Sequence, residues 1–373
     1  MPTDSYFSRE TLENAATRFL TGCPVLEIKE FGTGNINRTF LVTQGFHEKK
    51  PFLLQRLNTK VFQNPDLVLA NICSVTRHVR KQLESNRLVS DRRWEIPDFL
   101  PTTDGKDHWC SSDGSFWRAM SFIENSHVKD IITGPDHARE VGFALGTFHA
   151  LLSDLPISQL ADTLPGFHIT PTYLERYDEV LGALASKPSS QEEWCLRFVE
   201  EHRCWAPLLQ NAIRQGSLEL RPIHGDPKIN NILIDDLTGL ALSMIDLDTV
   251  KPGLIQFDIG DCLRSCCNAL GEETRDWEKV VFDPEIGREV LVGYCQIARR
   301  FLTPADFDFL PDAIRLIAFE LGLRFFMDHL DGNSYFKAAY RGHNLFRALV
   351  QFRLAESIDS QIDEIRAIVD DLR

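Results

Sequence analysis

Apolar and polar residues alternate along the first third of the chain, in the pattern of strands that bury one face. The alternation and the flanking turn residues predict strands at residues 25–29, 39–43, 51–57 and 117–123. Residues 65–83, between the third and the fourth of these, show helical periodicity instead. This order predicts a small lobe that combines a sheet with one helix.

The rest of the chain is mainly helical in its periodicity. Residues 136–152 place their large apolar side chains on one stripe. Residues 192–214 and 303–330 are also predicted to be helical, the latter with breaks around Pro304 and Pro311. Residues 186–193 are polar and include a proline, so a surface loop is expected there. The second part of the chain should therefore form a larger helical lobe.

A length of 373 residues accommodates two such lobes, and 43% hydrophobic residues provide for a sizeable core. We expect an α+β fold with a small, mainly antiparallel β lobe at residues 1–124. A larger, mainly helical lobe is expected at residues 125–373.

The charge balance and the cysteines argue against several classes of function. A formal net charge of -14 disfavours nucleic-acid binding, because phosphate backbones attract dense lysine and arginine. Nine cysteines occur without the paired C-x-x-C spacing of a zinc site, so we expect reduced, buried thiols, also at Cys262, Cys266 and Cys267. The first ten residues lack the apolar core of a signal peptide, and no apolar run approaches the ~20 residues that cross a bilayer. We expect a cytoplasmic protein without a membrane or nucleic-acid partner.

One segment concentrates the residues that phosphoryl transfer requires. The sequence His-Gly-Asp-Pro-Lys-Ile-Asn-Asn occupies residues 224–231, and two apolar strands are expected after it, at residues 232–234 and 240–245. The second strand leads to Asp246, twenty positions after Asp226. An H-G-D triplet alone is unspecific. The complete pattern corresponds in spacing to the kinase catalytic loop H-R-D-x-x-x-x-N and its later metal-binding aspartate.

Each residue of this pattern suits one part of the chemistry. A carboxylate must orient the acceptor hydroxyl and receive its proton, and Asp226 is the candidate. Oxygen ligands must hold magnesium against the β- and γ-phosphates, and Asn231 and Asp246 are the candidates. Lys228 is placed to offset the charge on the γ-phosphate in the transition state. The sequence therefore predicts a kinase that depends on ATP and Mg²⁺.

The nucleotide site is expected in the first lobe. Between the first two strands lie Gly32 and Gly34, with Asn37 where the third glycine of G-x-G-x-x-G would stand. Arg56, on the third strand, is predicted to contact the α- and β-phosphates in place of the usual lysine, because arginine binds phosphate oxygens in a bidentate way. The candidates for the hinge that meets the adenine edge are Ser121, Phe122 and Ile123.

These segments resemble the aminoglycoside phosphotransferase and choline kinase superfamily, which has a two-lobed, protein-kinase-like fold. Residues 34–42 are similar to its glycine loop and second strand, and residues 145–152 to the first helix of its large lobe. His149 and His224, within the matched motifs, are expected to be structural, hydrogen-bonding histidines. A narrower resemblance, to bacterial N-acetylhexosamine 1-kinases, rests on residues 54–58, 228–231, 245–253, 324–328, 332–337 and 343–345.

The narrower resemblance implies that ATP and an N-acetylated hexosamine give ADP and a sugar 1-phosphate. Asp226 would then act mostly by positioning, because an anomeric hydroxyl is more acidic than an ordinary alcohol. Glu320 and Asp328 share a helix face with Arg324 and are expected to form an intrahelical ladder of ion pairs. The candidates for sugar recognition are Asp248, Asp261, Arg264 and Arg324.

Three alternatives stay open. An enzyme of the same fold would act on an aminoglycoside, choline or an amino alcohol, and the acidic net charge suits such cations. A protein kinase is disfavoured, because Asp-Leu-Asp at residues 246–248 replaces D-F-G and no A-P-E segment follows. An inactive nucleotide-binding regulator is disfavoured by the intact catalytic pattern. The sequence leaves open the identity and epimer of the acceptor, ATP versus GTP, and the oligomeric state.

Overall fold

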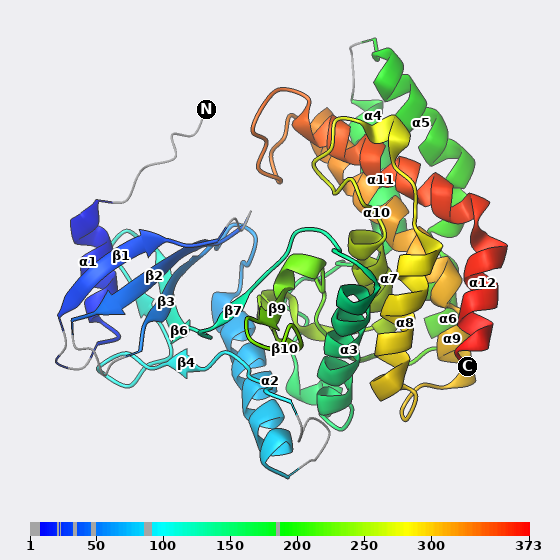
Figure 1. The fold of residues 1–373 in the computed structure, drawn as a ribbon. Coiled ribbons are helices and arrows are strands. Elements are labelled where there is room, and N and C mark those ends of the chain that lie inside the picture. Colours follow the sequence, from blue (N-terminus) through cyan, green and yellow to red (C-terminus); the bar gives the residue numbers. More distant parts are fainter. Residues whose placement is uncertain are drawn as a thin grey trace.

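The computed structural model of the protein describes residues 8–20, 22, 24–32, 36–45, 50–85, 92–183 and 187–373. A lobe built on an antiparallel sheet lies beside a larger lobe of helices (Figure 1). The predicted α+β fold is thereby confirmed. The lobe boundary after residue 124 stays a prediction. None of the described helices is both long enough and apolar enough to cross a membrane.

The small lobe is built around a sheet with strand order β1-β2-β3-β6-β4, and β5 lies beside β6. Each neighbouring pair is antiparallel. The strands are β1 Val25–Glu30, β2 Arg38–Gln44, β3 Phe52–Leu57, β4 Phe99–Leu100, β5 Trp109–Cys110 and β6 Phe116–Ser121. The four predicted strands all form, each displaced by no more than two residues at either end.

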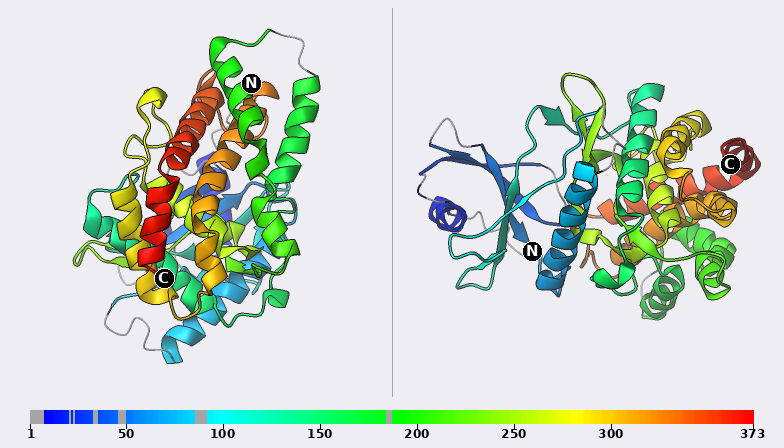
Figure 2. Two further views of the ribbon diagram at one scale, coloured as in Figure 1. Left: turned by 90° about the vertical axis from the view of Figure 1, so that its right-hand side faces the viewer. Right: turned by 90° about the horizontal axis from the view of Figure 1, so that it is seen from below.

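The alternation of side chains gives this sheet two different faces. One face packs against helix α1, Arg9–Thr17, through a small core that includes Phe40, Phe52, Leu54 and Trp117. Helix α1 lies on the side of the sheet away from the helical lobe (Figure 2). The opposite face carries the polar residues Thr39, Gln55 and Arg118, which are linked by hydrogen bonds, and Arg118 reaches Asp248 of the helical lobe.

Helix α2, Pro65–Ser85, lies between the sheet and the helical lobe (Figures 1 and 2). Its buried stripe belongs to the core of the helical lobe and consists of Val68, Leu69, Ile72, Val75 and Val79. Asn71 adds polar anchors, because its Nδ2 donates to the carbonyl oxygens of Val250 at 2.9 Å and Ala161 at 2.8 Å. Helix α2 therefore ties the small lobe to the large one.

Two helices of the large lobe touch through glycines. Helix α3, Pro135–Leu152, packs along α8, Pro284–Ala298. A Cβ atom at Gly142 would lie 1.8 Å from the carbonyl oxygen of Val290, and one at Gly293 would lie 1.9 Å from that of Arg139. Side chains at these two positions would force the helices apart.

The large lobe also contains two helices that are buried along most of their length, α7 Ile255–Cys266 and α10 Leu310–Leu330. Cys262, Cys266 and Cys267 are buried free thiols, as expected. Among the described residues, no three His, Cys, Asp or Glu side chains gather as a metal site. The other helices are α4 Thr170–Gly182, α5 Ser190–His202, α6 Leu208–Arg214, α9 Pro304–Asp308, α11 His343–Ser360 and α12 Ile362–Asp371.

The structure corrects two of the predicted elements in this lobe. The expected loop at residues 186–193 is wrong from residue 190 onward, because α5 begins there. Ser189 and Glu192 form a capping box, in which each side chain bonds the backbone N–H of the other residue. The helix predicted at residues 192–214 divides at Pro207, which has no N–H for a helical hydrogen bond. The helix predicted at 303–330 was expected to break around Pro304 and Pro311, and it forms as α9 and α10, which meet at Phe309.

Candidate active site

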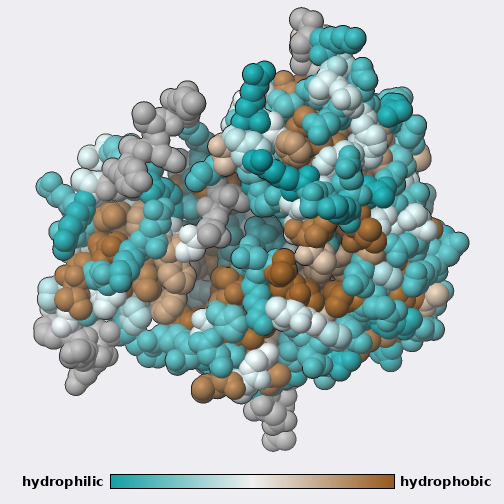
Figure 3. Space-filling model, turned by 45° about the horizontal axis from the view of Figure 1, so that its top comes forward, coloured by the Kyte–Doolittle hydropathy of each residue, from teal (hydrophilic) through white to brown (hydrophobic). Residues whose placement is uncertain are grey.

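Two small sheets, one of two strands and one of three, bring the catalytic segments together. Strand β8 Arg221–Ile223 pairs with β11 Lys251–Gly253, and β9 Ile232–Asp235 lies between β10 Ala241–Met244 and β7 Ser126–His127. As a result, Ile245 N–H donates to the carbonyl oxygen of Asn231 at 2.9 Å, and Thr249 Oγ1 donates to that of His224 at 2.7 Å. The chain after β8 thus lies beside the chain after β10. The molecular surface is hollowed where the two lobes meet (Figure 3).

Asp258, on α7, holds the catalytic loop by its backbone. Its Oδ2 accepts the N–H of His224 at 2.6 Å, and its Oδ1 accepts the N–H of Gly225 at 2.8 Å. His149 Nε2 also bonds Oδ2, at 2.9 Å. Burial acts to raise the pKa of Asp258, but these hydrogen bonds and the charge of His149 hold it below its usual value. Asp258 was not among the residues predicted from the sequence, although it lies in the Ile-Gln-Phe-Asp segment, residues 255–258, shortly after Asp246.

Gly225 is the residue that this packing demands. Its φ is +84°, in the left-handed region that suits glycine. A Cβ atom there would lie 2.7 Å from the carbonyl oxygen of Thr249. The middle residue of the H-G-D triplet therefore allows the catalytic loop to touch the metal-binding segment.

His224 and His149 are structural, as expected. His224 Nε2 donates to the carbonyl oxygen of Ile245 at 2.9 Å, and its Nδ1 accepts the N–H of Asp226 at 3.3 Å. Burial lowers the pKa of His224, so the neutral ring that this pairing requires is favoured. His149 Nδ1 bonds the hydroxyl of Tyr294 at 2.9 Å, which completes a buried network with Asp258.

Asp226 lies in a cluster with two other candidate residues. Lys228 Nζ donates to Asp226 Oδ2 at 2.7 Å. Asn231 Nδ2 donates to the Asp226 carbonyl oxygen at 2.7 Å and to Oδ2 at 3.3 Å. Burial acts to lower the pKa of Lys228, but Asp226 and Asp246 outweigh it and raise the pKa, so the amine is charged. Among the described residues no group bonds Asp226 Oδ1, which leaves that oxygen for an acceptor hydroxyl.

Asn231 and Asp246 provide oxygens that suit magnesium. The amide nitrogen of Asn231 is turned toward Asp226, so the Oδ1 atom of Asn231 remains available as a ligand for a cation. Asp246 has a left-handed backbone (φ 62°, ψ 56°), and within the described chain no hydrogen bond reaches its carboxylate. Asp246 is accessible from the cleft, yet protein surrounds it on most sides, and this burial together with Asp248 raises its pKa to about 7. Two oxygens beside nucleotide phosphates match the preference of Mg²⁺.

The cation of the small lobe that faces the catalytic segments is Arg118, not Arg56. Arg56 shares a strand face with Phe52 and Leu54, which pack toward α1, so strand alternation turns it away from the cleft. Arg118 Nε donates to Gln55 Oε1 at 2.8 Å, and its Nη2 pairs with Asp248. Its buried Nη1 has no partner in the described structure. The strand face of Arg56 therefore does not favour its predicted contact with the α- and β-phosphates, which stays a prediction, and Arg118 becomes an alternative candidate.

Asp248 joins the two lobes. It is 3% exposed, and its carboxylate pairs with Arg118 through Oδ1 and with Asn37 Nδ2 through Oδ2. Asn37 Oδ1 in turn accepts the N–H of Asn58 at 2.9 Å. Asp248 is thus occupied by small-lobe side chains and does not offer its oxygens to an acceptor, contrary to the sequence-based expectation.

The glycine segment follows β1 and the hinge follows β6, and the two segments meet through Phe31 and Phe122. Gly32 is exposed with φ +79°, whereas Gly34 lies outside the described residues. The rings of Phe31 and Phe122 meet edge to face at 5.4 Å. The backbone N–H and the hydroxyl of Ser121 are both engaged by Asp98. The N–H donates to the Asp98 carbonyl oxygen at 2.7 Å, and Oγ accepts the Asp98 N–H at 2.9 Å. Adenine would therefore meet the backbone at Phe122 and Ile123.

Asp261 and Arg264 form a buried group on α7. Arg264 Nε donates to Asp261 Oδ1 at 2.8 Å, and its Nη1 donates to Glu272 Oε2 at 3.0 Å. Burial acts to lower the pKa of Arg264, but the charges of Asp261 and Glu272 outweigh it and raise the pKa. The next residue, Ser265, accepts the N–H of Ile229 at 3.1 Å through its Oγ, so this part of α7 lies beside the catalytic loop. Asp261 Oδ2 is buried, and no group within the described residues bonds it. A polar ligand would reach that oxygen only after a shift of the side chains that cover it.

Arg324 lies among aromatic rings. Its guanidinium carbon is 5.1 Å from the ring centre of Phe167, 5.3 Å from that of Tyr173 and 5.4 Å from that of Phe336. The next residue to Phe167, His168, has Nε2 3.4 Å from the carbonyl oxygen of Gly225. Arg324 is thus connected to the catalytic loop through two consecutive residues.

The expected ion-pair ladder on α10 does not form. Glu320 accepts hydrogen bonds from His168 Nδ1 at 2.9 Å and Thr170 Oγ1 at 2.6 Å. Asp328 accepts the N–H groups of Tyr335 at 2.7 Å and Phe336 at 3.0 Å. Both carboxylates face other segments, because α10 is buried and its polar residues bond the loops that pack on it.

Comparison with known sequences and structures identifies related proteins. A model of the phosphotransferase enzyme family matches residues 27–289, a span that includes the Asp226 cluster but not Arg324. The fold resembles that of an aminoglycoside phosphotransferase from Alicyclobacillus acidocaldarius, with 14% identity, a TM-score of 0.62, and coverage of 99% of this chain and 98% of that one.

Two other solved structures have the same fold. The microcompartment-associated aminopropanol kinase is 16% identical, with a TM-score of 0.61 and coverage of 95% of this chain and 98% of that one. Choline kinase from Cryptosporidium parvum is 12% identical, with a TM-score of 0.60 and coverage of 98% and 99%. Similarity at these identities concerns the fold alone.

Proposed function

Because the chain belongs to the phosphotransferase enzyme family, we propose that it transfers the γ-phosphate of ATP to the anomeric hydroxyl of an N-acetylhexosamine. The main support is the cluster in which Lys228 and Asn231 bond Asp226 and Asp246 lies beside them. A cation, an acceptor-orienting carboxylate and two metal-binding oxygens together match the needs of phosphoryl transfer.

In the proposed reaction Asp226 Oδ1 orients the acceptor hydroxyl. The hydroxyl oxygen bonds the γ-phosphorus while the bond from that phosphorus to the β–γ bridging oxygen breaks, and ADP leaves with the electron pair. The hydroxyl proton passes to Asp226 and then to solvent. Lys228 offsets negative charge on the transferred group. Asn231 and Asp246 would hold Mg²⁺, which when bound neutralises phosphate charge.

The environment of Arg324 supports a neutral, oxygen-rich acceptor. Aromatic faces are where proteins bind ammonium groups, and here a guanidinium already lies over them. The ammonium of choline or of an amino alcohol would meet this positive charge. Hydroxyl and amide oxygens of an acetylated sugar would accept hydrogen bonds from it.

A second candidate acceptor is an amino alcohol or an aminoglycoside. The specific observation in its favour is Asp261 Oδ2, a buried oxygen without a partner in the described residues. An ammonium group would satisfy it as well as a sugar hydroxyl would. Two of the structural matches bear the names aminopropanol kinase and choline kinase.

A panel of acceptors with ATP and Mg²⁺ tests the proposal. N-acetylglucosamine and N-acetylgalactosamine should be turned over, with a sugar 1-phosphate detected by ³¹P NMR and by loss of the reducing end. Choline, 1-amino-2-propanol and kanamycin should be poor substrates. Turnover of an amine with none of either sugar would replace the first candidate by the second.

The variant Asp226→Asn tests the catalytic role. It should lower kcat by about 10³-fold or more, because the amide cannot take the hydroxyl proton, while ATP binding stays within about threefold. Unchanged turnover would refute the role of Asp226. ATP binding without turnover of any acceptor by the native protein would instead favour the inactive regulator.

A further inference from the structure

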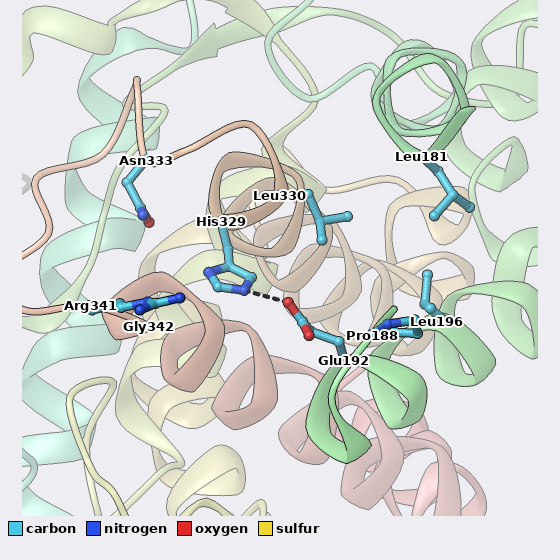
Figure 4. Close-up of a pocket in the computed structure, with 9 residues that line it drawn as sticks. All are labelled: Leu181, Pro188, Glu192, Leu196, His329, Leu330, Asn333, Arg341 and Gly342. Atoms are coloured by element: carbon cyan, nitrogen blue, oxygen red, sulfur yellow. Dashed lines mark hydrogen bonds and ion pairs between the residues drawn. The ribbon is translucent and has the colours of Figure 1, made fainter. Parts of the chain in front are cut away.

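A cavity of about 390 Å³ lies at the C-terminal end of α10, where His329 and Leu330 line it (Figure 4). Its walls come from the ends of α4 and α5, from α10, and from the segment 331–342 that joins α10 to α11. No residue that lines it belongs to the candidate active site. Its volume falls in the range that small-molecule sites have in proteins.

On the polar side of this cavity, the nitrogen groups of His329 and Arg341 lack partners among the residues that the structure describes. His329 Nε2 bonds Glu192 Oε1 at 2.9 Å (Figure 4), but its Nδ1 is buried and has no partner in the described structure. Arg341 extends toward His329 and makes no ion pair with any described residue. Glu192, the one carboxylate in the lining, is already engaged by His329 and by the N–H of Ser189 at 2.7 Å.

Helix α11 adds to this positive side. It begins at His343, directly after the lining residue Gly342, and no side chain within the described residues caps it. The amide dipoles of an uncapped helix end favour negative charge nearby. Together with Arg341 and His329 they favour an anionic group in the cavity.

The opposite side of the cavity is apolar. It is formed by Leu181, Pro188, Leu196 and Leu330. A phosphate or sulfate ion alone would leave these side chains in contact with water. A ligand that combines an anionic head with a compact apolar body would cover both sides.

The segment 331–342 connects this cavity with the candidate acceptor site. Its two ends, at Asn333 and at Arg341, line the cavity. Its middle contains Phe336, whose ring contacts Arg324. Asn333 is also tied to α11, because its Oδ1 accepts Asn344 Nδ2 at 3.0 Å. A ligand that fixes the ends of this segment would fix the position of the ring at Arg324.

We propose that this cavity is a second binding site, for a small amphiphilic anion with a phosphate or carboxylate head and an apolar body. Its occupancy sets the affinity for the acceptor through the segment 331–342. The effect on the acceptor rests on the proposed kinase function, whereas binding itself does not.

Isothermal titration of the native protein with phenyl phosphate, benzoate and phenol tests the binding. Phenyl phosphate or benzoate should bind with a dissociation constant of about 1 mM or below, and phenol about tenfold more weakly. Arg341→Gln removes the charge, and Leu196→Trp fills the apolar side. Each should weaken binding at least about tenfold. The matched control is Arg366→Gln, on the exposed surface of α12, which should leave binding unchanged.

Acceptor kinetics at saturating ATP test the coupling. Phenyl phosphate should shift the KM for the acceptor at least about twofold in the native enzyme, and the shift should vanish in Leu196→Trp. Binding that persists in both variants would place the probe elsewhere and overturn the proposal, as would no binding of any probe at about 10 mM. Binding that the variants abolish, without a change in KM, would refute the coupling. A protein that binds the probe but phosphorylates no acceptor would count against the kinase function and not against this site.

Discussion

Replacement of Asp258 by asparagine should separate the positioning of the catalytic loop from the chemistry itself. Asp258 is fully buried and accepts three hydrogen bonds, from His224 N–H, Gly225 N–H and His149 Nε2. In asparagine one oxygen becomes an NH₂ group, which cannot accept. The orientation that loses least turns the NH₂ group toward Gly225, so only the hydrogen bond from Gly225 N–H is lost. The hydrogen bonds from His224 N–H and His149 Nε2 remain, but their acceptor is now a neutral amide oxygen.

The size of the effect follows from these contacts. A hydrogen bond to a charged group contributes about 1.5–3 kcal/mol, so the loss should be about 3 kcal/mol in the free energy of unfolding. For 373 residues the unfolding entropy is about 0.8 kcal/mol/K, which converts this loss into a fall of about 4 °C in Tm. Because the loop amides would shift, kcat should fall by about 10²-fold with little change in ATP affinity.

Calorimetry and steady-state kinetics of Asp258→Asn provide the measurement. The control is Asp236→Asn, because this carboxylate is about half exposed and should affect neither quantity measurably. If Asp258→Asn melted and turned over like the native protein, the assigned role of Asp258 would be refuted. A fall in Tm alone, with native kcat, would show that Asp258 stabilises the lobe without setting the catalytic geometry.

Three further predictions concern the neighbouring groups. Arg118→Lys should raise the KM for ATP about tenfold, because lysine lacks the forked donors with which Arg118 bonds Gln55 and Asp248. Arg56→Lys should raise it less than twofold, and equal effects of the two variants would contradict the assignment of Arg118 to the cleft face of the sheet. Gly225→Ala should lower the free energy of unfolding, measured by denaturant titration, by about 2–4 kcal/mol. Alanine is strained at a φ of +84°, and its Cβ would meet the Thr249 carbonyl oxygen. An unfolding midpoint equal to that of the native protein would contradict this prediction. The KM for Mg²⁺ should rise about tenfold from pH 8 to pH 6. The cation binds the ionised carboxylate of Asp246, and because the pKa of this group is about 7, protons compete with Mg²⁺ below pH 7. A flat profile would exclude this linkage.

The sequence by itself determined the class of fold and the chemistry. Strand and helix periods depend on local residue order, so the four predicted strands of the small lobe and helices α2 and α3 form with ends shifted by two residues or fewer. The spacing from Asp226 to Asn231 and Asp246 was also readable, because a short loop and one strand pair fix where those side chains go.

Only the tertiary structure decided which polar residues face one another across the molecule. Arg56 and Arg118 are equally basic in sequence, but the choice between them depended on which face of the sheet packs on α1. Asp248 and Glu320 were assigned from their chain neighbours, yet each bonds a partner more than a hundred residues away. Asp258 was missed for the same reason. Local patterns specify elements, whereas the pairing of buried charges is set by packing between elements, which no short stretch of sequence contains.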